Sequence, residues 1–154
     1  MPIIEPSSIL DSLSTVPLVE FAEGDLLLRQ GDHTERLLFL KDGAVEILRD
    51  GAVLASVSEP GAVFGDMAVI LGRPHSADVL ATQPSLCHVI ENPAQRLKAD
   101  PALALYVMTV LATRLDAVNG SLIEARERLG ESDRGFLADT LDKLGRAMGV
   151  GVPL

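Results

Sequence analysis

The sequence has little cysteine and little positive charge. Cys87 is the one cysteine in 154 residues, so no disulfide can form within the chain, and a lone thiol fits a reducing compartment. The chain has 13 lysines and arginines against 22 acids, a formal net charge of −9, and no lysine- or arginine-rich run. Because nucleic acids and anionic membrane surfaces are bound through basic patches, we expect neither as a partner.

The sequence also lacks the signs of a targeting or membrane segment. No basic segment followed by an apolar stretch opens the chain, so no secretory signal is recognised. No stretch approaches the ~18 uncharged apolar residues of a membrane span. We therefore expect a cytoplasmic protein.

The length and the apolar content of 47% predict one folded domain with a helical tail, since the chain is too short for two ordinary domains. We expect a roll of strands with flanking short helices over residues 1–100, a long helix over 101–130, and a terminal helix with a tail over 131–154. The fold class is α+β, with an antiparallel, jelly-roll-like β-roll (a double-stranded β-helix). A short helix precedes the roll, another interrupts it, and further helices follow it.

Short extended runs separated by turn residues carry the prediction of a roll. These runs are Leu18–Phe21, Leu26–Arg29, Leu37–Lys41, Ala44–Leu48, Val53–Val57, Val63–Phe64, Asp78–Thr82 and Leu86–Ile90. Asp50 and Gly51, between two alternating segments, predict a two-residue hairpin because glycine accepts a positive φ at little cost. Many short strands at regular spacing favour a roll or barrel.

Capping residues and prolines mark the expected helices. Ser7 or Ser8 can cap a short helix that carries Ile9, Leu10 and Leu13 and that Pro17 ends. Asn92 with Pro93 predicts a cap and a short helix to Lys98, and Asp100 with Pro101 repeats this arrangement. A last helix from about Ser132 presents Leu137, Leu141, Leu144 and Met148 on one side and ends at Gly149 and Gly151.

The long helix carries apolar residues at alternating intervals of four and three, which is a heptad pattern. They are Ala104, Met108, Leu111, Leu115, Val118, Leu122, Ala125 and Leu129. About 26 residues make a helix of ~39 Å, longer than a small roll can cover, so we expect a parallel homodimer through residues 104–129. The same stripe could instead cover the chain's own roll. Gly120 costs ~1 kcal/mol against alanine, so a bend at this point is compatible with the sequence.

The segment from Phe64 to Val79, FGDMAVILGRPHSADV, stands between the predicted roll and the later helices. Gly65 and Asp66 open a short helix that runs from Met67 to Leu71. The unpaired N–H groups at its start and the positive end of its dipole favour an anion. Glycine before a short helix is also ordinary turn chemistry.

This segment resembles the phosphate-binding cassette of cyclic nucleotide-binding domains, whose pattern is approximately FGE-(L/M)-AL, a few residues, then PR-(S/T)-A. The spacing is unbroken over Phe64, Gly65, Met67, Ala68, Val69, Gly72, Pro74, Ser76, Ala77 and Val79. The resemblance extends over Val19–Ile90, with scaffold matches at Phe21, Gly24, Gly31, Phe39, Gly43 and Val45. It implies a β-roll that binds cAMP or cGMP.

By this resemblance the ligand-binding residues are Phe64, Gly65, Asp66, Met67, Ala68, His75, Ser76 and Ala77. Residues 65–68 would contact the sugar-phosphate, and residues 75–77 the phosphate. Asp66 replaces a glutamate that bonds the ribose hydroxyl in the family, and His75 replaces the arginine that pairs with the phosphate. Asp66 can instead cap its helix, and His75 can be an ordinary loop histidine. Arg73 can supply the missing guanidinium or be a solvated surface residue.

No pattern in the sequence indicates catalysis, a metal or a cofactor. Cys87 and His88 are neighbours on a predicted strand and so point to opposite faces, which argues against joint metal binding. No Ser/His/Asp or Cys/His motif has supporting context. We therefore expect no enzymatic activity.

The first hypothesis is a stand-alone sensor in which a cyclic nucleotide shifts the C-terminal helices, which an effector protein reads. Bacterial regulators that carry this domain have a helix-turn-helix after the long helix, whereas here one helix and a tail follow Gly130, so DNA binding is not expected. Two alternatives stay open. One is a degenerate domain that serves dimerisation or partner docking, and the other is a domain that binds a different ligand such as a nucleoside.

Overall fold

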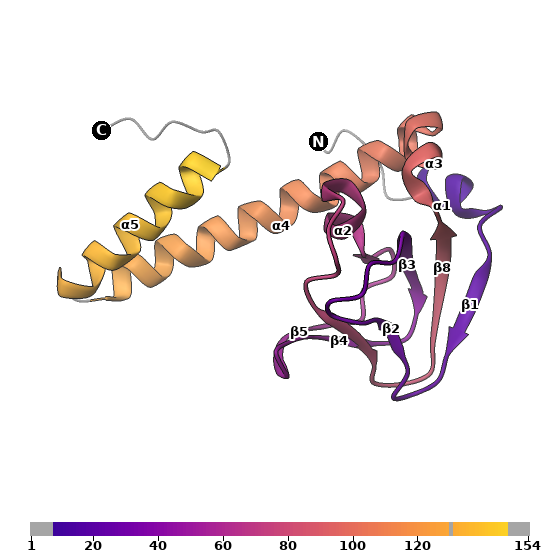
Figure 1. Cartoon of the computed structure of the whole chain (residues 1–154), viewed down its shortest axis with the longest axis horizontal. Helices are drawn as coiled ribbons and strands as arrows, with labels where there is room; N and C mark the ends of the chain where they lie inside the picture. Colours follow the sequence, from indigo (N-terminus) through magenta and orange to yellow (C-terminus); the bar gives the residue numbers. More distant parts are fainter. Residues whose placement is uncertain (1–7, 130, 148–154) are drawn as a thin grey trace. The chain divides into compact units, whose positions relative to one another are not determined.

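The computed structural model describes residues 8–129 and 131–147, which divide into two compact units (Figure 1). The first unit, Met1–Val110, holds the strands, three short helices and the start of a long helix. The second, Leu111–Leu154, holds the rest of that helix and a further helix. The elements are α1 (Ser8–Leu13), β1 (Leu18–Phe21), β2 (Leu26–Leu28), β3 (Arg36–Asp42), β4 (Val45–Arg49), β5 (Ala52–Val57), β6 (Val63–Phe64), α2 (Asp66–Leu71), β7 (Asp78–Ala81), β8 (Ser85–Glu91), α3 (Pro93–Ala99), α4 (Pro101–Arg128) and α5 (Glu131–Ala147).

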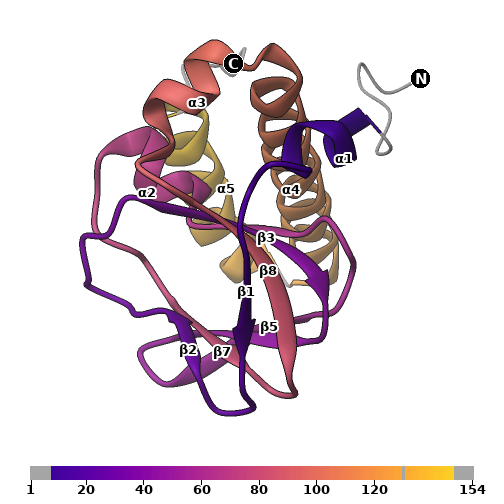
Figure 2. The ribbon, with the colours of Figure 1, turned by 90° about the vertical axis from the view of Figure 1, so that its right-hand side faces the viewer.

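The strands of the first unit form two four-stranded antiparallel sheets, which confirms the predicted β-roll. The strand order is β1-β8-β3-β6 in one sheet and β2-β7-β4-β5 in the other. Most neighbours in a sheet come from distant parts of the chain, as a roll requires. The helices α1, α2 and α3 lie towards one end of the strands (Figure 2).

Every predicted strand is present, with ends that differ by at most one residue. The hairpin at Asp50 and Gly51 is confirmed, because Arg49 pairs directly with Ala52. Both turn residues have positive φ, 51° and 79°, as a two-residue turn that matches the twist of its strands requires.

Strand β3 is buried on both faces. Leu38 and Leu40 belong to the core cluster between the sheets, together with Phe64. The alternate residues of the strand point the other way, and the ring of Phe39 lies 6.3 Å from that of Tyr106 on α4. Burial on both sides explains why β3 carries four consecutive apolar residues instead of an alternating pattern.

Two expected helix ends differ in detail. Helix α1 ends at Leu13, before Pro17, and the N–H groups of Ser14 and Val16 form turn bonds to the carbonyls of Asp11 and Leu13. The position before a proline disfavours helical backbone, so the helix ends ahead of it. Asn92 occupies the N-cap position of α3 but forms no side-chain capping bond.

The predicted cap of the long helix is confirmed: Asp100 Oδ1 accepts a bond from the backbone N–H of Leu103 at 3.1 Å. Helix α4 runs without a break through Gly120, so glycine does not end it there. Within the first unit its buried side chains are Leu103 and Val107, which lie beside the expected heptad stripe and not on it. The predicted end of the last helix at Gly149 and Gly151, together with Ser7 and Met148, lies outside the described residues.

Helix α4 is long and apolar enough to cross a membrane when judged by length and composition alone. This finding corrects the expectation that no stretch approaches that length. Much of the apolar surface of the helix is exposed, including Leu115 at 45% and Val118 at 54%. Exposed apolar side chains are also typical of a helix that packs against another protein chain.

The turn between β3 and β4 depends on Gly43, which has a φ of 112°. A Cβ at this position would lie 2.6 Å from the Cα of Ser85, a buried residue that bonds the backbone of Ala44. Gly24 has a comparable φ of 88°, but open space surrounds its missing Cβ. Both positions would strain an alanine backbone, but only position 43 would also bring its Cβ into steric overlap. Comparing alanine substitutions at the two positions therefore separates the two effects.

We expect Gly43→Ala to lower the free energy of unfolding by about 2–4 kcal/mol, because left-handed strain and overpacking add. Gly24→Ala, the control, should lose about 1–2 kcal/mol from strain alone. Urea unfolding of both variants measures the difference. Equal losses would mean that Ser85 moves aside without strain.

Candidate functional site

The predicted cassette begins where β6 meets α2, and Gly65 sets the geometry of that junction. Its φ is 84°, and a Cβ there would clash with the backbone carbonyl oxygen of Arg36. Glycine is therefore required for two independent reasons. Gly65 is also the N-cap residue of α2, and the helix begins at Asp66. The interpretation of Asp66 as the cap is therefore wrong, because Asp66 already has helical backbone.

The predicted ligand residues differ widely in exposure. Phe64 belongs to the core cluster, and Asp66 is also buried, at 3% exposure. Met67 is 54% exposed, and Ser76 is exposed. Of the others, Ala68 and His75 are buried, and Gly65 and Ala77 are half-buried. The set therefore does not form one continuous exposed surface.

The loop after α2 is tied to the loop between β2 and β3. The N–H of Gly31 donates to the carbonyl of His75 at 2.9 Å, and the N–H of His75 donates to the carbonyl of Asp32 at 2.9 Å. The N–H of Gln30 donates to Asp78 Oδ1 at 2.7 Å. The first two bonds hold the backbone of the cassette loop, and the third holds the side chain at the start of β7, against residues far away in the sequence.

The imidazole of His75 lies inside the protein, at 4% exposure. Its Nε2 lies 2.5 Å from Thr34 Oγ1, so this nitrogen already has a hydrogen-bond partner. Burial lowers the pKa of His75 below the ordinary 6.5, while a hydrogen bond to the backbone of Thr34 and the nearby Asp32 act in the opposite direction. The sequence alone did not indicate that His75 is buried.

Sequence reasoning missed Thr34, which contacts His75 from 41 positions away. No local motif marks this threonine, and only the folding of the β2–β3 loop against the cassette loop brings the two side chains together. Arg73, the other candidate for the missing guanidinium, is exposed. In the described structure the cassette loop therefore presents its imidazole inward and its guanidinium to solvent.

The neighbours Cys87 and His88 point to opposite faces of β8, as predicted. Cys87 lies in the core cluster, and burial raises the pKa of its thiol to about 11. His88 Nδ1 lies 3.1 Å from the carbonyl oxygen of Val16, on the other face. Within the residues that the structure describes, no group of three or more His, Cys, Asp or Glu side chains could hold a metal ion.

Comparison with known proteins connects this geometry to a family. The family model of the cyclic nucleotide-binding domain matches residues 18–98. The cAMP-dependent protein kinase regulatory subunit of Yarrowia lipolytica is 39% identical over 61 residues, which are 40% of this chain and 16% of that protein. Glutaminase 2 of Bradyrhizobium diazoefficiens is 38% identical over 111 residues, which are 66% of this chain and 17% of that protein. The matched segments thus span less than a fifth of these relatives.

A solved structure supports the same fold. The catabolite activator protein of Thermus thermophilus superposes with a TM-score of 0.64 at 24% identity, over 82% of this chain and 64% of that one. At this level of identity the likeness shows the fold alone. The family model, however, covers more than half of the chain and includes all eight described strands and the whole cassette. This protein therefore belongs to the family of cyclic nucleotide-binding domains.

Proposed function

We propose that this protein is a non-enzymatic sensor module that binds cAMP or cGMP at its divergent cassette. The observation that carries the proposal is the backbone of the cassette, where the left-handed Gly65 packs against Arg36 and opens α2. Position 65 still requires glycine, although Asp66 and His75 differ from the residues that the family has at the other two positions. A helical start held in this way offers N–H donors to a phosphate.

In the proposed complex the sugar-phosphate lies against residues 65–68, and Asp66 takes the place of the family's glutamate at the ribose. The phosphate lies against His75, Ser76 and Ala77. Because Nε2 of His75 is bonded to Thr34, we propose that the imidazole exchanges that partner for the phosphate. A neutral imidazole gives one ordinary hydrogen bond, so the affinity is expected to be lower than with arginine.

The signal is proposed to be a population shift of the C-terminal helices, which an effector protein reads in the cytoplasm. We further propose that α4 pairs with a second copy in parallel through Leu111, Leu115, Val118 and Leu122. Leu115 and Val118 are exposed on the described helix, and burying them in a dimer removes apolar surface from water.

The alternative function is a degenerate domain that binds no cyclic nucleotide and serves dimerisation or partner docking, or that takes another ligand such as a nucleoside. One observation favours it: His75 is buried and bonded, while Arg73 points to solvent. A neutral ligand would need no cation at this point. The variants below separate the two functions.

We expect the wild-type protein to bind cAMP or cGMP, and His75→Arg to bind it about 10- to 100-fold more tightly, because a charge-assisted bond replaces an ordinary one. His75→Ala should bind more weakly. Thr34→Val, the matched control, removes the competing partner but keeps the imidazole, so it should not weaken binding. Calorimetry measures the affinities, and thermal melting checks each fold. A folded His75→Arg protein that binds neither nucleotide would support the degenerate or altered-ligand domain instead.

Binding should tighten as the pH falls from 7.8 to 5.8. Burial lowers the pKa of His75 in the free protein, whereas a bound phosphate raises it, so the complex takes up a proton and acid favours binding. The effect on folding has the opposite sign: a lowered pKa means that stability falls as the pH drops below 6.5. A melting curve at pH 5.8 must therefore accompany the titration. His75→Ala should abolish the pH dependence, and a wild-type affinity that does not change with pH would remove His75 from the phosphate site.

The paired substitution Leu115→Glu with Val118→Glu should convert the dimer to monomer, because two charges would then lie in the apolar interface. The control pair Ala117→Glu with Gly120→Glu adds the same charge at exposed positions away from the stripe and should leave the dimer intact. Light scattering measures the mass of each protein. A monomeric wild type at high protein concentration would contradict the proposed interface.

A further inference from the structure

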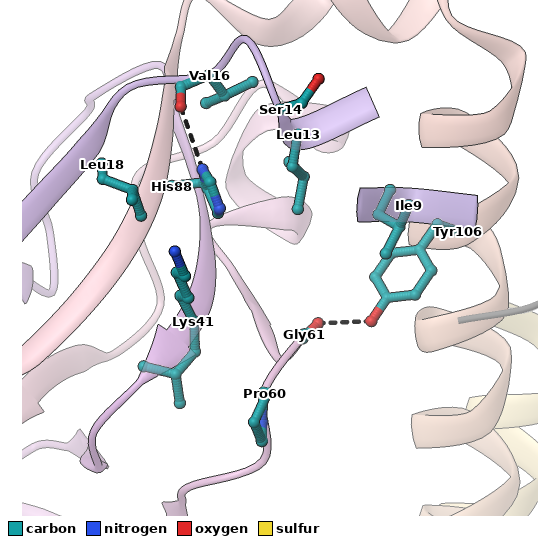
Figure 3. A pocket seen from close by; sticks show the side chains of 11 residues that line it. Ile9, Leu13, Ser14, Val16, Leu18, Lys41, Pro60, Gly61, His88 and Tyr106 are labelled. Carbon is teal, nitrogen blue, oxygen red and sulfur yellow. Dashed lines mark hydrogen bonds between the residues drawn. The ribbon is translucent and has the colours of Figure 1, made fainter. Parts of the chain in front are cut away.

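A cavity lies beside the sheet β1-β8-β3-β6, where His88, Leu18 and Lys41 line it. It has a volume of about 620 Å³, within the roughly 300–1,000 Å³ of small-molecule sites. The first unit alone supplies its lining, from α1, β1, β3, β8, the turn before β6 and the first part of α4 (Figure 3). None of the eight cassette residues lines it.

Apolar side chains make most of this cavity. Leu13 of α1 and Leu18 of β1 line it. Tyr106 lines it from α4, and its hydroxyl donates to the carbonyl of Gly61 at 2.8 Å. This bond holds the aromatic ring in place beside the cavity (Figure 3). An apolar ligand would therefore meet a largely preformed wall.

One cation, the exposed side chain of Lys41, lines the cavity, and a β-bulge places it there. Leu40 pairs with Cys87 and Asp42 with Leu86, so Lys41 is an extra residue on β3 with no opposite residue on β8. Bulges turn side chains away from the regular alternation and often lie beside binding sites. Lys41 forms no ion pair with any described residue, although the protein carries a net charge of −9.

His88 supplies a second polar group beside Lys41. A carbonyl oxygen only accepts hydrogen bonds, so the bond to Val16 places a proton on Nδ1 of His88. The other ring nitrogen points towards the ammonium of Lys41 (Figure 3). Among the described residues that line this cavity, none is acidic. Lys41 is therefore the group on the polar side of the cavity that would pair with an anionic head group, while the unprotonated nitrogen of His88 faces the ammonium as an acceptor.

From this arrangement we infer that the cavity binds an amphipathic monocarboxylic acid. Its carboxylate pairs with the ammonium of Lys41, and its alkyl or aromatic body lies against Leu13, Leu18 and Tyr106. A neutral ligand of the same shape would gain no charge pairing with Lys41, and a cationic ligand would be repelled by it. This site is independent of the proposed cyclic nucleotide site.

The protein contains its own probe for this test, because Tyr106 is the one tyrosine of a chain without tryptophan. We would titrate the full chain with octanoate below its micelle concentration, following tyrosine fluorescence and heat. We expect saturable binding of one octanoate per chain. Octan-1-ol should bind at least about 10-fold more weakly because it lacks the charge. Hexanoate should lose about fourfold per missing methylene.

Lys41→Met keeps the length of the side chain and removes its charge. It should weaken octanoate binding about 10-fold or more and leave octan-1-ol binding unchanged. Lys98→Met, on an exposed residue of α3 outside the cavity, should change neither, and melting curves check that all three proteins are folded. The proposal is overturned if octanoate does not bind at millimolar concentration, or if it binds equally to the wild type and to Lys41→Met. Equal binding of octanoate and octan-1-ol would overturn the assignment to acids.

Discussion

Strand β3 is packed from both sides, and the rest of the first unit depends on that packing. Its inner face, at Leu38 and Leu40, closes the core of the roll, while Phe39 on its outer face meets Tyr106 of α4. A slip of one residue would exchange the side chains of the two faces, so that Phe39 would leave Tyr106 and enter the core in place of a leucine. The register with β8 and β6 is therefore fixed.

Two functional consequences follow from this fixed register. Leu38 pairs with Phe64, so the residue immediately before Gly65 is held in the sheet, and the junction with α2 starts from a rigid position. At the other end of β3 the bulge at Lys41 releases one side chain from the regular alternation. The cassette and the cavity lined by Lys41 thus occupy opposite ends of one strand, and the same core supports both.

The chemistry of the cassette loop shows how burial changes the role of a residue. A histidine in place of arginine is a weaker phosphate partner even when exposed, because it has fewer donors and an intermittent charge. Inside the protein it is weaker still, since burial lowers its pKa and Thr34 occupies its Nε2. In the proposed complex, the affinity for a nucleotide therefore includes the free energy of turning one imidazole towards the ligand.

Much of this protein could be predicted from local sequence, because local rules determine those features. The strand positions follow from apolar runs between turn residues, and the Asp50–Gly51 hairpin follows from the need for positive φ. The resemblance to the family follows from glycines and small residues at fixed spacing, and the family match over residues 18–98 confirms the family. The cap at Asp100 is equally local, since its bond reaches only three residues along the chain.

Contacts between distant segments decided the rest. The pairing of Thr34 with His75, the clash that reserves position 65 for glycine, and the bulge that exposes Lys41 all join segments that no sequence period connects. The apolar stripe of α4 is a mixed case: the sequence determined its heptad spacing, but only the fold showed that Leu103 and Val107, beside that stripe, are the side chains buried in the first unit.

The sequence by itself determines which segments are apolar and which turns can form, because these depend on each residue and its near neighbours. The tertiary structure decides which side chains lose water and which partners they gain, and these two changes set the charge of a histidine and the accessibility of a lysine.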